Sequence, residues 1–129
     1  MTAERAAEWA LKRKEGLPLI YSSAEPAVVK AAQERYGRAE IAGRIEHFFG
    51  EAARLLAAAG VTRIVSAGGE TSGAVVESLK VGAMEIGPEI DPGVPALRVV
   101  GRDLALALKS GNFGAADFFE RAPRVLLGR

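Results

Sequence analysis

The feature that most constrains this chain is the segment from Val65 to Val76, which reads Val-Ser-Ala-Gly-Gly-Glu-Thr-Ser-Gly-Ala-Val-Val. A short β-branched run meets three glycines and then an apolar run at helical spacing, which predicts a strand, a tight loop and a helix N-terminus. Backbone N–H groups at such a junction lack partners within the helix, and the helix dipole adds partial positive charge. A phosphate group is therefore the expected ligand.

A second glycine-rich stretch, from Lys109 to Gly114, also follows a strand-like run. Lys109 is well placed to neutralise phosphate charge, although a lysine that merely snorkels from a strand end would show the same pattern. Ser110, Gly111 and Asn112 come next, and Asn112 could equally fill a left-handed turn position. Two such loops in one small α/β chain indicate a nucleotide cradle.

The size and composition of the chain exclude several classes of protein. Its 129 residues suffice for one domain with a real core, which we place at residues 1–129. The net charge of +1 argues against a nucleic-acid-binding surface. The chain has no cysteine, which excludes disulfides and thiolate metal sites and is compatible with the cytoplasm, the expected location. The sequence holds no apolar run of membrane-spanning length, and residues 1–14 do not follow the pattern of a signal peptide.

Hydrophobic periodicity and turn residues divide the chain into alternating helices and strands. The expected helices occupy residues 2–14, 38–59 and 115–121, with one more between the Ser23 cap and Gly37 and one from the glycine loop to about Lys80, while the expected strands occupy 17–21, 62–67, 84–86, 97–100 and 104–108. Residues 87–95 carry three prolines and predict a stiff loop.

This alternation predicts an α/β layered domain with a mostly parallel sheet and flanking helices. The last two expected strands, 97–100 and 104–108, form a candidate antiparallel pair because only three residues connect them.

The loop from Gly68 to Gly73 matches neither of two familiar phosphate-binding motifs. It lacks the Gly-Lys-Ser/Thr ending of a P-loop, and its glycine spacing differs from the dinucleotide-binding fingerprint. The glycines could simply permit a positive-φ turn and tight helix packing. In the functional interpretation, the hydroxyls of Thr71 and Ser72 cap the helix or donate to phosphate oxygens. Glu70 would repel a phosphate unless a metal ion compensates.

The remaining chemistry-bearing residues favour structural roles. Asp91 lies in the proline-rich loop, where it is a turn former first and a metal or ribose ligand second. Asp117 begins the last helix, where a carboxylate meets the helix dipole favourably. His47, the only histidine, is expected to be a half-exposed structural residue. One histidine and no cysteine leave no catalytic triad and no metal cluster to assemble.

Taken together, these motifs resemble the four-carbon acid sugar kinase family, and specifically its C-terminal nucleotide-binding domain. Four blocks match in order: Tyr21-Ser22-Ser23-Ala24, the glycine loop of residues 67–75, the proline-rich residues 87–95, and residues 106–114 followed by Asp117-Phe118-Phe119. Four blocks in order make the resemblance specific, and it spans most of the chain, roughly residues 17–122.

The resemblance implies a much longer, two-domain kinase. The N-terminal domain of such a kinase binds a sugar acid (erythronate, threonate or 3-oxo-tetronate), the C-terminal domain binds ATP, and the phosphoryl group passes across the cleft between them. The implied ATP contacts are the loop from Gly68 to Thr71 and the position of Gly111.

The mechanism that this resemblance implies depends mostly on positioning and charge neutralisation. The groups that would hold the ATP phosphates are the backbone N–H groups of Gly68, Gly69 and Gly73 and the hydroxyls of Thr71 and Ser72. Lys109 would add positive charge. Mg²⁺ would bridge phosphate oxygens, with Glu70 or Asp91 as candidate ligands. The base that activates the sugar hydroxyl is expected on the other domain.

Set against the family pattern, we expect this chain to lack the sugar-binding domain. We also expect the start of the nucleotide domain to be truncated, without the Gly-Ser loop that in the family precedes the region of residues 1–14. We therefore expect weak ATP binding, no turnover by the chain alone, and a sugar-binding domain or partner chain. The alternative is a non-catalytic interaction or regulatory module that retains an anion-binding glycine loop, with the Trp9 face of the first helix in contact with a partner or another copy.

Overall fold

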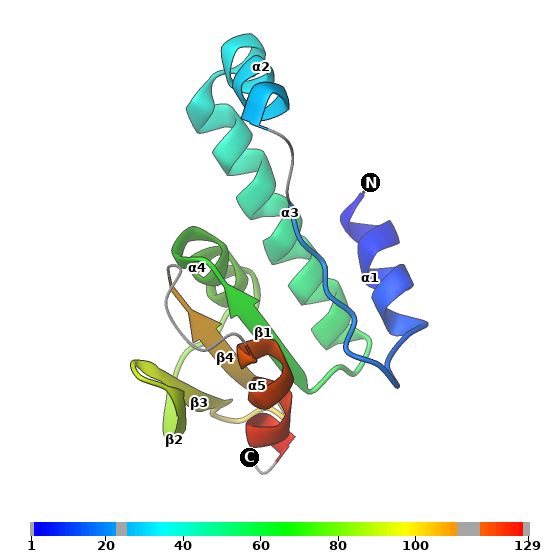
Figure 1. The fold of residues 1–129 in the computed structure, drawn as a ribbon. Helices are drawn as coiled ribbons and strands as arrows, with labels where there is room; N and C mark the ends of the chain where they lie inside the picture. The colour runs from blue at the N-terminus through cyan, green and yellow to red at the C-terminus, as the bar shows by residue number, and fades with distance from the viewer. Residues whose placement is uncertain (1, 23–25, 111–116, 128–129) are drawn as a thin grey trace.

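The computed structural model describes residues 2–22, 26–110 and 117–127 of the chain. Its elements follow one another as α1 (Ala3–Leu11), α2 (Pro26–Tyr36), α3 (Arg38–Ala58), β1 (Arg63–Ala67), α4 (Gly69–Ser78), β2 (Met84–Asp91), β3 (Val94–Val99), β4 (Ala105–Lys109) and α5 (Phe118–Leu127). The strands form one sheet in the order β1-β4-β3-β2, with α3 and α4 over one face and α5 over the other (Figure 1). The predicted layered α/β class with flanking helices is confirmed.

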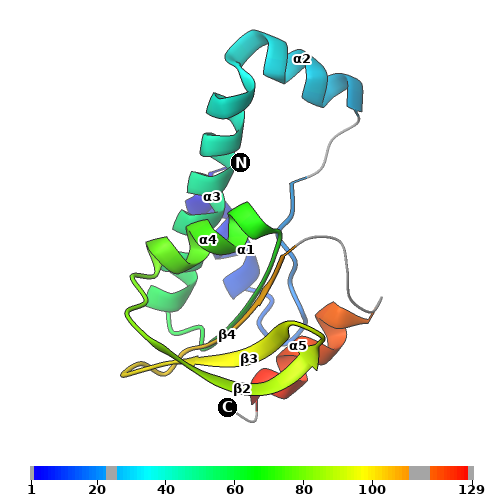
Figure 2. The same cartoon turned by 90° about the vertical axis from the view of Figure 1, so that its left-hand side faces the viewer.

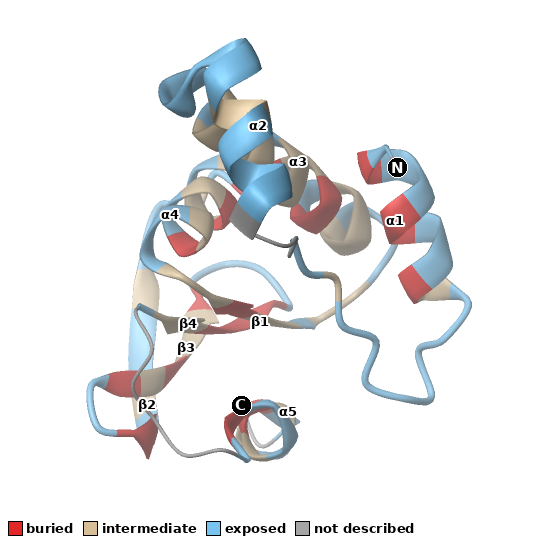
Figure 3. Cartoon of the chain, turned by 45° about the horizontal axis from the view of Figure 1, so that its top comes forward, coloured by how far each residue is buried: buried red, intermediate tan, exposed pale blue. Residues whose placement is uncertain are grey.

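Strand β4 shows how the alternation of side chains builds a core on both faces of the sheet. Leu106 and Leu108 pack toward α3 and α4, whereas Ala105 and Ala107 pack toward α5. Successive side chains of a strand point to opposite faces, so one strand serves both layers. The small alanines leave room for Phe118 of α5, and buried residues line both sides of the sheet (Figure 3).

The sheet is mixed in direction. β1 and β4 run parallel, whereas β4 pairs antiparallel with β3, and β3 pairs antiparallel with β2. The expected antiparallel pairing of the last two strands is therefore confirmed. The expectation of a mostly parallel sheet is wrong for the described residues, in which one pair is parallel and two are antiparallel.

The error over strand direction arises from residues 87–95, which form a β-hairpin rather than a stiff loop. β2 and β3 turn back on each other at Pro92 and Gly93, and Gly93 has a φ of +80°. Pro88 is tolerated because β2 is an edge strand whose pairing register shifts between Ile86 and Glu89. The Gly93 N–H also donates to Glu89 Oε1 at 2.8 Å, which fixes the turn.

Residues 17–21 form no strand in the described structure. They are an extended segment that connects α1 to α2 and runs past α3 (Figures 1 and 2). Leu17, Leu19 and Tyr21 are 63%, 50% and 72% exposed. The apolar run has the composition of a buried strand, but a strand needs hydrogen-bonding neighbours, and none of the described strands pairs with it.

The first and last helices differ from their expected lengths. α1 ends at Leu11, and its buried face consists of alanines that pack on α3, whereas Trp9 is 37% exposed beneath the Arg13 guanidinium. α5 continues through Pro123 to Leu127. Three of its residues, spaced four apart, are buried against the sheet and hold the helix together beyond the expected end at residue 121: Phe118, Ala122 and Leu126.

The α2 helix and the N-terminal half of α3 project away from the sheet (Figures 1 and 2). Val28 and Val29 on α2 are 58% and 39% exposed, so this projection carries apolar surface toward solvent. The exposed apolar residues of α2 and of the 17–21 segment, Leu17, Leu19, Tyr21, Val28 and Val29, are called the apolar arm below.

Candidate functional site

The two glycine-rich stretches meet at one edge of the sheet. β1 and β4 are parallel neighbours whose last residues, Ala67 and Lys109, stand opposite each other in the register. Parallel strands end at a common edge, so Gly68 and Ser110, the residues that follow them, begin at the same edge of the sheet. A Cβ built on Gly69 would lie 3.9 Å from Ser110 Cβ, which shows that the loop after β1 touches the start of the loop after β4.

Gly68 forms the bend between β1 and α4. Its φ of +102° and ψ of 130° belong to a region that only glycine adopts without strain. Its N–H donates to the carbonyl oxygen of Lys109 at 2.7 Å. This N–H therefore joins the two strand ends, and the expectation that it would hold a phosphate is corrected.

The first turn of α4 presents three backbone N–H groups that have no acceptor within the helix, those of Gly69, Glu70 and Thr71. Gly69 and Glu70 are exposed, so an anion can reach this turn. Gly73 lies one turn further along, where the N–H belongs to the intrahelical ladder, so the expected phosphate contact through its N–H is also corrected. The site expected at Gly69, Glu70 and Thr71 stays a prediction.

Ser72 points into the protein rather than toward the edge. It is 8% exposed, and its hydroxyl oxygen lies 3.1 Å from Ser66 Oγ and 3.5 Å from the Lys109 carbonyl oxygen, both within hydrogen-bonding distance. Ser72 was expected to offer its hydroxyl to a phosphate, and the structure assigns that hydroxyl to an internal contact instead. The helical spacing of Ser72, Val75 and Leu79 on one face could have revealed this burial.

The loop after β4 is described only at its start. Lys109 is half-buried and contributes its backbone carbonyl to the junction, while Ser110 is exposed beside Gly69. The expected ligands Gly111 and Asn112 lie outside the described residues. The structure thus brings Lys109 and Ser110 to the first turn of α4.

Asp91 is not a free carboxylate. It is 7% exposed and forms an ion pair with Arg121, whose guanidinium also binds Asp117 at 3.0 Å and donates to the Ile90 carbonyl at 2.6 Å. The hydrogen bond that Arg121 donates to Asp91, followed by the one it donates to Asp117, raises the pKa of Arg121 above its ordinary value. The expectation that Asp91 could ligate Mg²⁺ is corrected, because its carboxylate serves to hold α5 against the end of β2.

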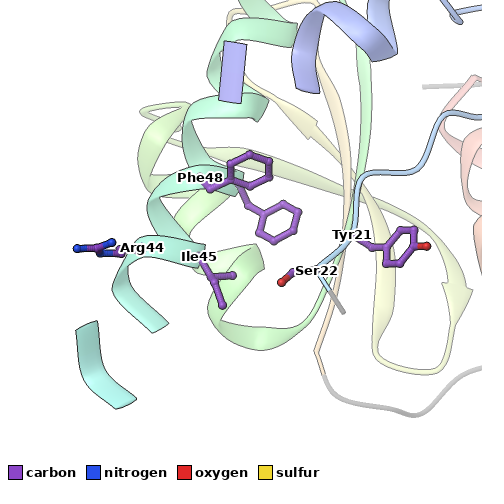
Figure 4. A pocket seen from close by; sticks show the side chains of 6 residues that line it. Tyr21, Ser22, Arg44, Ile45 and Phe48 are labelled. Carbon is purple, nitrogen blue, oxygen red and sulfur yellow. The ribbon is translucent and has the colours of Figure 1, made fainter. Parts of the chain in front are cut away.

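A hollow that the sequence did not reveal lies along α3. It has a volume of about 360 Å³ and is lined by Tyr21, Ser22, Arg44, Ile45, Phe48 and Phe49. Figure 4 shows Ile45 and Ser22 on its opposite walls, with the Tyr21 ring turned away. The pattern of Ile45, Phe48 and Phe49 predicted a helix packed on the sheet, and gave no sign that this turn of α3 would be half-open.

The described residues contain neither a metal-binding cluster nor a membrane-spanning helix. Among the described residues, no group of three or more His, Asp or Glu side chains is arranged to hold a metal ion. Within the same ranges, no helix combines the length and the apolar character needed to cross a membrane.

Relatives of known name cover nearly the whole chain. A 3-oxo-tetronate kinase of Brucella melitensis is 47% identical over 121 residues, which are 92% of this chain and 28% of that protein. A 3-oxo-tetronate kinase of Pseudomonas fluorescens is 50% identical over 118 residues, which are 91% of this chain and 27% of that protein. The chain thus spans less than a third of the length of these relatives.

The fold agrees with a solved structure. A crystal structure of a Haemophilus influenzae protein superposes with a TM-score of 0.86 at 40% identity, over 96% of this chain and 31% of the other. The family model described as the nucleotide-binding C-terminal domain matches residues 1–119. The chain therefore belongs to the family of nucleotide-binding C-terminal domains.

Proposed function

We propose that this chain is the ATP-binding part of a kinase that phosphorylates a four-carbon sugar acid. The observation that carries the proposal is the meeting of two loops at the common end of β1 and β4, where the first turn of α4 faces Ser110. Free N–H groups, a helix dipole and exposed glycine backbone are what the phosphates of a nucleotide require. The nucleotide-binding family and the relatives named 3-oxo-tetronate kinase support the same assignment.

The residues of this edge fit a bound triphosphate. The N–H groups of Gly69, Glu70 and Thr71 would bind phosphate oxygens, and Ser110 would close the other side. The absence of a side chain at Gly69 leaves the backbone open to close approach. These groups hold the phosphates in place, which is the main contribution of a protein to phosphoryl transfer.

Mg²⁺ would supply charge neutralisation between phosphate oxygens when it is bound with ATP. Among the described carboxylates near the edge, only the exposed Glu70 lies in the first turn of α4 itself. Repulsion between Glu70 and phosphate falls once a cation lies between them, so we propose Glu70 as a contact of the hydrated ion.

The acceptor and the base that activates it are proposed to come from the remainder of a longer protein. The relatives are more than three times the length of the matched segment, and as 3-oxo-tetronate kinases they are named for that acceptor. The apolar arm supports this division, because exposed apolar surface of this kind is typical of an interface. We propose that the apolar arm contacts a sugar-binding domain or partner chain. We also propose that the protein acts in the cytoplasm, with which the lack of cysteine is compatible.

Calorimetric titration with ATP, ADP and AMP, each with and without Mg²⁺, tests the nucleotide assignment. ATP and ADP are expected to bind and AMP to bind more weakly, because AMP offers fewer phosphate oxygens and less negative charge to the N–H groups of the first turn of α4. Absence of saturable heat at millimolar ATP would contradict the proposal.

A coupled assay for ADP release tests the division of labour. The chain alone, given ATP and 3-oxo-tetronate, is expected to release no ADP above the rate without acceptor. Turnover by the chain alone would show that the site needs no further domain. The non-catalytic alternative predicts no ADP release even when the remaining segment of a relative is supplied.

A further inference from the structure

A buried pair of hydroxyl groups lies beneath the edge where the two loops meet. Ser66 of β1 and Ser72 of α4 are 6% and 8% exposed, and their oxygens lie 3.1 Å apart. Burial of a hydroxyl costs free energy unless it is hydrogen-bonded, and alanine would avoid that cost at either position. The pair therefore requires an explanation beyond packing.

The pair lies next to the carbonyl of Lys109, the last residue of β4. This carbonyl accepts the Gly68 N–H at 2.7 Å and lies 3.5 Å from Ser72 Oγ. The Ser72 hydroxyl has one proton, so it donates to the Lys109 carbonyl when the Ser66 hydroxyl donates to Ser72 Oγ. The carbonyl oxygen has two lone pairs and can then accept both this hydrogen bond and the one from the Gly68 N–H. One peptide group thus connects the bend after β1, the first turn of α4 and the start of the loop after β4.

We propose that the Ser66–Ser72 pair is a positioning element of the nucleotide site, which sets the separation between the first turn of α4 and Ser110. This inference rests on the proposed function. The pair touches no ligand itself. It acts by holding the Lys109 carbonyl, and a carbonyl held from both sides leaves the phosphate-binding N–H groups and the second loop in fixed relative positions.

The experiment compares Ser72→Ala with Ser78→Ala by two readouts, the ATP dissociation constant and the exchange rate of the Gly68 amide. Ser78 is a half-buried serine at the far end of the same helix, so it is the matched control. Ser72→Ala is expected to weaken ATP binding by about 3- to 10-fold, the worth of one net hydrogen bond. It is also expected to speed Gly68 exchange, while Ser78→Ala changes neither.

Two variants of Ser66, Ser66→Ala and Ser66→Thr, test whether the effects of Ser72→Ala come from misfolding. Ser66→Ala should reproduce both effects and Ser66→Thr should restore them, because threonine keeps a hydroxyl and is favoured in strands. In the double variant, the loss of affinity should be smaller than the product of the two single losses, since both serines act through one carbonyl. A purely structural role would lower the melting temperature and leave the ATP affinity of the folded protein unchanged.

The outcomes separate the two proposals. Unchanged ATP affinity and unchanged Gly68 exchange in Ser72→Ala and Ser66→Ala would overturn the positioning role. Equal effects in Ser72→Ala and Ser78→Ala would overturn it as well. If the unaltered chain binds no nucleotide, the proposed function fails, and Gly68 exchange then decides by itself whether the serine pair sets the geometry of the two strand ends.

Discussion

Arg121 of α5 forms an ion pair with the buried carboxylate of Asp91, 30 positions earlier in the chain. The same guanidinium binds Asp117 one turn before it in the chain and donates to the Ile90 carbonyl, so a single side chain joins α5 to the end of β2. A buried carboxylate left without its partner is strongly unfavourable. The contact therefore fixes the docking of α5 rather than serving chemistry.

Replacing Arg121 with methionine should lower the urea midpoint of unfolding. The substitution keeps most of the apolar stem and removes the positive charge that pairs with the buried Asp91 carboxylate, so the loss of stability comes from the loss of this ion pair. Arg124→Met, at an exposed position of the same helix, should change stability by no more than about 0.5 kcal/mol. If the two variants had the same urea midpoint, the ion pair between Arg121 and Asp91 would not be what holds α5 against β2.

Replacing Gly50 with alanine should destabilise the protein by about 1–3 kcal/mol, although alanine favours a helix. A Cβ on Gly50 would overlap Ser78 Oγ and lie 3.0 Å from the Ala74 carbonyl oxygen, so α3 and α4 would have to separate. Chemical denaturation measures the change. Adding Ser78→Ala should recover only part of it, since the backbone contact with Ala74 remains.

The control for this prediction lies in the same helix. A Cβ on Gly43 would meet nothing within 4 Å, so Gly43→Ala should stabilise the protein by about 0.5–1 kcal/mol through helix propensity alone. If Gly50→Ala and Gly43→Ala both raised the free energy of unfolding, α3 and α4 would not be in close contact at Gly50.

The features that local sequence determines were predictable. Gly37 and Gly60 bound α3 with positive φ values of +85° and +99°, and Gly68 bends the chain between β1 and α4. Glycine at these points is readable from the sequence because few other residues adopt such angles. The first turn of α4 followed from the same signal.

The features that depend on distant contacts were not predictable. Pro88 suggested a loop because its tolerance depends on β2 being an edge strand, a property of the whole sheet. The composition of residues 17–21 suggested a strand, but pairing requires a neighbour that the described strands do not provide. The partner of Asp91 lies 30 positions away, and no local pattern indicates it.

Replacing Gly73 with alanine should leave nucleotide binding unchanged and raise stability by about 0.5–1 kcal/mol. Gly73 is exposed within α4, and a Cβ there would meet none of the described residues within 4 Å. Titration with ATP and thermal melting check the two halves of the statement. A marked loss of ATP affinity in Gly73→Ala would show that Gly73 is part of the phosphate site after all.

Gly68 and Gly69 should respond differently to alanine, although they are adjacent. Gly68→Ala forces a side chain into a φ of +102° and should cost about 1–3 kcal/mol of stability. Gly69 has no such angle, and its new methyl group would lie at an ordinary contact distance of 3.9 Å from Ser110 Cβ, so the fold should persist. That methyl group would occupy the space between the two loops and should weaken ATP binding about tenfold or more, which is about 1.4 kcal/mol.

Parallel measurements of unfolding and of ATP titration on the two variants separate stability from binding. Gly68→Ala is expected to lower the free energy of unfolding. Gly69→Ala is expected to keep the native free energy of unfolding but to bind ATP more weakly. Native ATP affinity in Gly69→Ala would show that phosphate does not enter between the first turn of α4 and Ser110. Among the described residues, Ser110 is the only contact of that methyl group within 4 Å, so the result would move the nucleotide away from this edge of the sheet while leaving the description of the fold intact.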